Sequence, residues 1–177
     1  MGIFAQKLKG YEGVLKLIST VPTGRKALHL FYPLLSSGQV QILSYPPDLR
    51  KKLTEGEPSL KPLGAAFVTD GNEGSIYYDD QGELGVLAVL IFHEMIHSLD
   101  ETLWLAGRFE LPTHQRNEII FQSECKAYSE QYSFQKELKE AYPQLIDYFI
   151  SRAENFPSLN RQVEPHEIAE LHKGQGR

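Results

Sequence analysis

The chain has 177 residues, of which 41% are hydrophobic and 23% charged, and its formal net charge at pH 7 is −5. This composition predicts a globular domain whose core needs no disulfides, and the single Cys125 excludes an internal disulfide and a cysteine-based zinc cluster. The negative charge argues against nucleic acid or an anionic membrane as the main partner. The longest uncharged apolar run, residues 84 to 92, is too short to cross a bilayer.

No repeat, low-complexity tract or linker divides the chain, so we expect one domain over residues 1 to 177. Within it, residues 1 to 60 supply N-terminal helices and a strand, residues 61 to 141 the central part, and residues 142 to 177 C-terminal helices. The start contains scattered lysines and no apolar run of signal-peptide length. We therefore expect a soluble protein and favour the cytoplasm; a periplasmic or secreted location stays open if a signal was removed.

The first part of the chain predicts two amphipathic helices, at residues 6 to 18 and 24 to 35, with Thr23 as the N-cap of the second. The alternating, β-rich stretch QVQILSY at residues 39 to 45 predicts a strand, which the Pro-Pro pair after it stops. We expect a short helix and a polar loop at residues 48 to 62.

In the middle of the chain, the spacing of apolar residues changes from the alternation typical of strands to the spacing typical of a helix. Residues 65 to 80, AAFVTDGNEGSIYYDD, predict two strands around a Gly-Asn-Glu-Gly turn. Residues 83 to 106 then predict one helix, with Asp79 or Asp80 as N-cap and Gly107 as the C-terminal stop.

The last part predicts a loop at residues 108 to 116 and a long helix at residues 117 to 141, which ends near Pro143. A further helix is expected at residues 144 to 154, and a short terminal one after Pro157. Helices, then a few strands, then helices again predict an α+β fold.

The motif that carries chemistry is HEMIH, at residues 93 to 97 of the predicted helix. His93 and His97 are four residues apart and so project from one helix face, where their nitrogens can share a zinc ion. Glu94 is rotated from His93 by about 100° and is poorly placed as a ligand. It can instead take a proton from a zinc-bound water, so the spacing predicts two ligands and one general base.

A third ligand is expected from the second long helix. Its apolar stripe runs through Glu124 and the small Ala127, and a core-facing carboxylate there needs a partner such as zinc. Glu118, about 120° away around the helix, and His114 in the predicted loop stay open as alternatives. Asp100 is too close to His97 along the helix to be a ligand, but it is well placed to hold an imidazole or the helix end.

The pair of motifs HEMIH and SECKAYSEQ (residues 123 to 131) resembles the gluzincin branch of the HExxH zinc metallopeptidases. The resemblance implies a zincin-like core, in which a small β-sheet or hairpin packs on the HExxH helix and a second long helix carries the third ligand. It also implies one zinc ion per chain, bound by His93, His97 and Glu124, with Glu94 as base. Tyr128 is the candidate that stabilises the reaction intermediate, with Tyr132 and His114 as alternatives.

The resemblance further implies a peptide or protein substrate that pairs with an edge strand, here expected at residues 74 to 80. The sequence therefore predicts a zinc-dependent hydrolase that cleaves peptide bonds. The alternative from another class is a zinc-stabilised binding module without turnover. A helical adaptor that binds no metal is the third interpretation.

Overall fold

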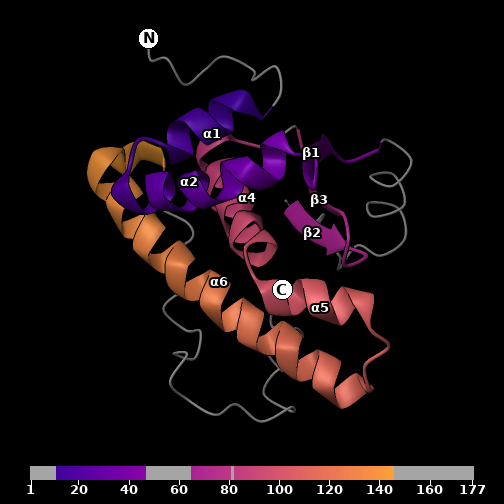
Figure 1. The fold of residues 1–177 in the computed structure, drawn as a ribbon. Helices are drawn as coiled ribbons and strands as arrows, with labels where there is room; N and C mark the ends of the chain where they lie inside the picture. The colour runs from indigo at the N-terminus through magenta and orange to yellow at the C-terminus, as the bar shows by residue number, and fades with distance from the viewer. Residues whose placement is uncertain (1–10, 47–64, 81, 146–177) are drawn as a thin grey trace, which may run out of the picture.

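The computed structural model describes residues 11 to 46, 65 to 80 and 82 to 145 (Figure 1). The predicted helices at residues 48 to 62 and after Pro157, and nearly all of the one at residues 144 to 154, lie outside the described residues. The described part is α+β, as predicted, with five α-helices, one three-stranded sheet and a short 3-10 helix. The elements follow one another in the order α1 (Glu12–Ile18), α2 (Pro22–Ser36), β1 (Val40–Ser44), β2 (Ala65–Thr69), β3 (Gly74–Tyr78), α4 (Leu84–Ser98), α5 (Glu101–Arg108), α6 (Thr113–Ala141) and η2 (Pro143–Leu145).

Helix α2 begins earlier than predicted, and Thr23 is not its N-cap. The helix starts at Pro22, because the fixed φ of proline suits the first helical position, where no backbone N–H is needed. Thr23 instead donates from its backbone N and from Oγ1 to the two carboxylate oxygens of Glu137 in α6, at 2.8 and 2.7 Å. These two hydrogen bonds fix the start of α2 against the last turns of α6.

Gly24 allows α2 to lie directly against the end of α1. A Cβ atom at this position would stand 1.9 Å from the carbonyl oxygen of Ile18, which is closer than any real contact. The close approach buries Ile18 and Ala27 in the core. Gly24 is therefore required for the close packing of α2 on α1.

The strand order in the sheet is β1-β3-β2. Strands β2 and β3 pair antiparallel, from Ala65 opposite Tyr78 to Thr69 opposite Gly74, which confirms the predicted hairpin. Strand β1 pairs with β3 in parallel. The predicted edge strand at residues 74 to 80 is thus wrong: β3 is the middle strand, its backbone is paired on both sides, and the edges are β1 and β2.

The single helix predicted at residues 83 to 106 is two helices. Asp100 leaves the helical conformation and caps α5, because its carboxylate accepts from the backbone N of Thr102 at 3.1 Å. Trp104 then folds back and donates from Nε1 to the carbonyl oxygen of Ser98, at the end of α4, at 2.8 Å.

The predicted ends of that helix also differ from the structure. Helix α4 starts after Glu83 with no side-chain cap, so Asp79 and Asp80 are not its N-cap. Gly107 lies inside α5 and does not stop it. A Cβ atom there would stand 2.7 Å from the backbone N of Gly71, so this glycine lets α5 pack against the turn of the hairpin.

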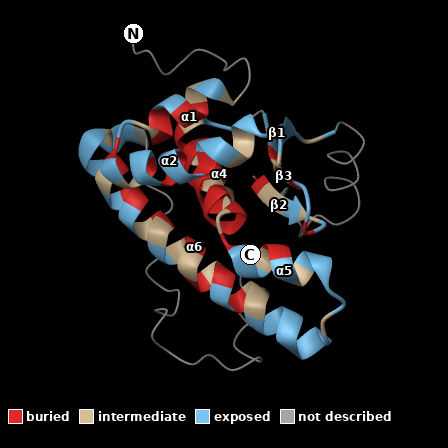
Figure 2. Cartoon of the chain, in the orientation of Figure 1, coloured by how far each residue is buried: buried red, intermediate tan, exposed pale blue. Residues whose placement is uncertain are grey.

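Helix α4 is the centre of the fold, and α6 is the long helix that crosses it (Figure 1). Figure 2 shows α4 as almost continuously buried, because α1, α2, α6 and the hairpin strands all contact it. Helix α6 has 29 residues and starts at Thr113, so exposed His114 belongs to its first turn and not to a loop. No helix among the described residues is both long and apolar enough to span a membrane.

We expect Gly24→Ala to destabilise the protein by about 1–3 kcal/mol, because the added methyl group overpacks the α1–α2 contact. Helix propensity alone predicts the opposite sign, since alanine is favoured over glycine inside a helix by about 1 kcal/mol. Urea denaturation followed by circular dichroism measures the change. Lys26→Ala, at an exposed site two residues later, is the matched control and should change stability by less than about 0.5 kcal/mol. Equal stability of Gly24→Ala and wild type would contradict the packing role.

Candidate metal centre

His93 and His97 project together from the C-terminal half of α4. Each residue is only 7% exposed, and their Nε2 atoms are 3.0 Å apart. The rings meet nearly edge to face, with centroids 4.7 Å apart. The four-residue spacing thus brings both imidazoles to one point, as predicted.

Glu124 reaches the same point from α6. Its Oε2 lies 3.3 Å from Nε2 of His93, and its Oε1 lies 3.4 Å from Nε2 of His97. The crossing of the two helices is fixed nearby by Phe92 and Phe134, whose rings stack with centroids 4.2 Å apart. These three side chains form a group that could hold a metal ion.

The alternative ligands do not join this group. Within the described part of the chain, His93, His97 and Glu124 are the one set of three or more histidine, cysteine or acidic side chains close enough together to hold a metal ion. Glu118 and His114 are exposed on the first turns of α6. Cys125 is buried outside the group, and burial raises the pKa of its thiol to about 11.

A second set of side chains holds the outer nitrogens of both imidazoles. Nδ1 of His93 lies 2.8 Å from the amide oxygen of Gln131, and Nδ1 of His97 lies 2.9 Å from the hydroxyl of Ser123. An amide oxygen can only accept, so Nδ1 of His93 carries a proton. Ser123 donates its own proton to Asp100, so its oxygen accepts from His97.

These hydrogen bonds orient the imidazoles for metal binding. With the proton of each neutral ring on Nδ1, both Nε2 atoms present lone pairs to the shared point, where Glu124 adds a carboxylate. Burial alone would raise the pKa of Glu124, but the interactions of its carboxylate with His93 and His97 outweigh burial and lower that pKa below its usual value. Three electron-pair donors that face one another in this way favour a cation between them.

Glu94 lies beside the group but is not part of it. Its Oε2 accepts from the backbone N of Phe67 in β2 at 2.7 Å. Burial raises the pKa of Glu94 to about 7, with a further contribution from the charge of Glu124, although His93 and the Phe67 N–H act in the opposite direction. Glu94, the candidate general base, is therefore held against strand β2 of the hairpin.

Two tyrosines lie near these groups. The ring of Tyr128, one turn after Glu124, packs edge-on against His93, with centroids 4.5 Å apart. Tyr45 follows β1 and stacks on Tyr77. Burial and the negative charge of Glu94 raise the pKa of Tyr45 to about 12.

Sequence reasoning identified the three clustered side chains and Asp100, but it missed Ser123 and Gln131. Gln131 falls on the apolar stripe of the second long helix, and a polar residue on a core stripe is a signal that it has a buried partner. Ser123 precedes Glu124 directly and gives no comparable signal. Its hydrogen bond to Asp100 depends on the end of α4 before Asp100, which the sequence did not indicate. Comparison with protein-family models, with curated proteins and with solved structures found no match to this chain.

We expect Ser123→Ala to weaken the binding of a divalent metal by about 10- to 100-fold, because the change removes the group that holds Nδ1 of His97. Competition with a chromophoric chelator, with Zn²⁺ and Co²⁺ as probes, measures the affinity. Ser129→Ala, the same change at an exposed position of the same helix, is the control and should leave the affinity unaltered. Equal affinities of the two variants would show that Ser123 does not support the site.

Proposed function

We propose that the protein is a zinc-dependent hydrolase that cleaves peptide bonds. The spacing of the donor atoms carries this proposal. A tetrahedral ion with bonds of about 2.0–2.1 Å places its ligand atoms about 3.3 Å apart. The Nε2 atoms of His93 and His97 are 3.0 Å apart, and each lies 3.3 or 3.4 Å from a different oxygen of the Glu124 carboxylate. Two imidazoles and one carboxylate suit zinc, whereas calcium takes more ligands, all oxygen, at longer distances.

Zinc bound at this site would polarise a substrate carbonyl and lower the pKa of a bound water to about 7. The protein's own side chains would then carry out the proton transfers. One carboxylate oxygen of Glu94 accepts from Phe67, which fixes the side chain and leaves the other oxygen to accept a proton from the attacking water. Glu94 then delivers this proton to the leaving amine nitrogen, as the resemblance to gluzincins implies.

Strand β2 provides the edge that a peptide needs. The N–H of Phe67 points to Glu94 and not to β3, so the peptide groups of Ala65 and Thr69, two residues away on either side, face the same way. An extended substrate can add to this edge, next to the metal centre, in the manner first expected for residues 74 to 80. A sheet edge of this kind favours peptides over sugars or phosphate esters as substrates.

Tyr128 is the residue that we propose for stabilising the tetrahedral intermediate. Its ring packs against His93, one of the proposed ligands, and it belongs to the same helix as Glu124. A phenol O–H is a suitable donor to a developing oxyanion.

We expect about one zinc ion per chain in protein purified without a metal-binding tag. Glu124→Ala should lower the zinc content well below one, because it removes a ligand, whereas Glu118→Ala at an exposed position of the same helix should leave it unchanged. Elemental analysis after dialysis measures both. Loss of zinc in Glu118→Ala and its retention in Glu124→Ala would reverse the assignment, and absence of zinc from wild type would favour the metal-free adaptor.

We expect Glu94→Gln to lower the rate of peptide hydrolysis by at least about 10²-fold, because general base catalysis contributes 10²- to 10⁴-fold. Zinc content and circular dichroism should match wild type, since glutamine keeps an oxygen that accepts from Phe67. Cleavage of a fluorogenic peptide library measures activity, and Glu118→Gln, the same change at an exposed position, is the control. A wild-type protein that holds zinc but cleaves no peptide would favour the zinc-stabilised binding module.

A further inference from the structure

A pocket of about 490 Å³ lies between the far end of β2 and the junction of α5 with α6. Apolar residues from three elements and from the loop between α5 and α6 line it: Phe67, Val68, Leu103, Ala106, Phe109 and Ile120. Val68 and Phe109 are 57% and 59% exposed. The pocket is thus an open apolar hollow on the described surface.

One residue of the pocket, Phe67, also contacts Glu94 beside the proposed metal centre. The contact is the hydrogen bond that its backbone N–H donates to Glu94. Ile120 lines the opposite side, one helical turn before Glu124 on α6. A peptide that runs along the edge of β2 past Glu94 therefore passes over this pocket within about two residues, at 3.3 Å per residue.

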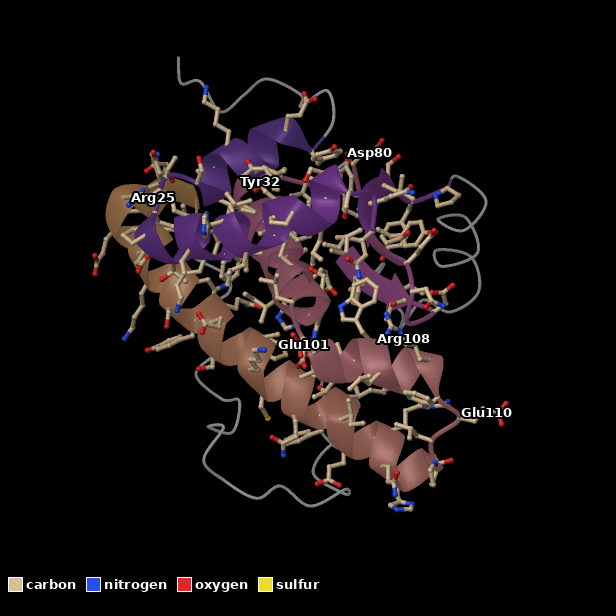
Figure 3. All side chains as sticks on the ribbon, in the orientation of Figure 1. Arg25, Tyr32, Asp80, Glu101, Arg108 and Glu110 are labelled. Atoms are coloured by element: carbon tan, nitrogen blue, oxygen red, sulfur yellow. The ribbon has the colours of Figure 1, made fainter. Side chains whose placement is uncertain are left out.

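Three charged residues, Arg108, Glu110 and Arg116, also line the pocket. Arg108 donates from Nε to the carbonyl oxygen of Gly71, and its charge lies close enough to Asp70 to help lower the pKa of that carboxyl, after the larger effect of backbone hydrogen bonds in the turn. Its guanidinium is therefore engaged with the hairpin. Figure 3 shows Glu110 pointing outward, away from the helices. Arg116 lies at the exposed start of α6.

We propose that this pocket receives a large apolar side chain, aromatic or branched aliphatic, of a peptide that pairs with the edge of β2. The inference rests on the proposed function and names its substrate class: peptides with such a residue within about two positions of the cleaved bond. Burial of a side chain of this size stabilises a complex by about 1.5–3 kcal/mol, which is enough for selection among peptides.

The test separates binding from hydrolysis. Zinc-loaded Glu94→Gln protein is titrated with labelled hexapeptides that differ at one central position, which is Phe, Leu, Gly or Asp, and fluorescence anisotropy gives the affinities. We expect the Phe and Leu peptides to bind at least about 10-fold more tightly than the Gly peptide. Ala106→Phe, which fills the pocket, should remove this difference without weakening the Gly peptide.

Leu105→Phe is the matched control. Leu105 is on another face of α5 and lines a separate groove with Leu30 and Trp104. It should keep the full preference for Phe and Leu. If Ala106→Phe does not fold, Val68→Asp places a charge in the pocket at an exposed position and should remove the same preference.

Two results would overturn the pocket assignment: affinities that do not depend on the central residue, or tightest binding of the Asp peptide. Tightest binding of Asp would show that Arg108 and Arg116 govern the pocket. Failure of the proposed function is a different result, in which wild type cleaves no peptide although Glu94→Gln still distinguishes Phe from Gly.

Discussion

The convergence of two imidazoles and one carboxylate is the interaction on which the other features of the structure depend. Nε2 of His93, Nε2 of His97 and the carboxylate of Glu124 lie 3.0–3.4 Å from one another; the histidines are buried, and Glu124 is partly buried. Burying these groups is unfavourable unless their charges and lone pairs are compensated. Around them, α4 and α6 pack against each other, and Gln131 and Ser123 form hydrogen bonds with the outer nitrogens of the imidazoles. The arrangement therefore resembles a metal site with its supporting hydrogen bonds already in place.

The interruption between α4 and α5 links this centre to the remainder of the fold. A continuous helix would keep Asp100 in helical conformation, but in its extended conformation the carboxylate caps α5 and also accepts from Ser123. The same interruption turns α5 toward the hairpin, where Gly107 and Gly71 pack closely. One acidic residue thus connects an imidazole of the site, the start of a helix and the wall of the neighbouring pocket.

The spacing of residues along the sequence was enough to predict which side chains each of the two helices brings to the candidate metal site. The i, i+4 pair His93 and His97 fixes a shared face by helical geometry alone, and the apolar stripe of the later helix distinguishes Glu124 from Glu118. The Gly-Asn-Glu-Gly turn likewise allowed the hairpin of β2 and β3 to be predicted. What the sequence could not show depends on pairing between distant segments: β1 joins β3 from the other side and makes it the middle strand, and Thr23 binds Glu137 and not its own helix. The end of α4 before Asp100 was not predicted, because the helical spacing of apolar residues continues past this position.

The bonds from Thr23 to Glu137 join residues 114 positions apart, which has a consequence for how the chain folds during synthesis. Helix α2 leaves the ribosome before α6, yet α6 covers part of its surface. Contacts of this separation form only after a long loop has closed, and such loops slow folding. The face of α2 that packs against α6 therefore stays uncovered until almost the whole described chain has been translated.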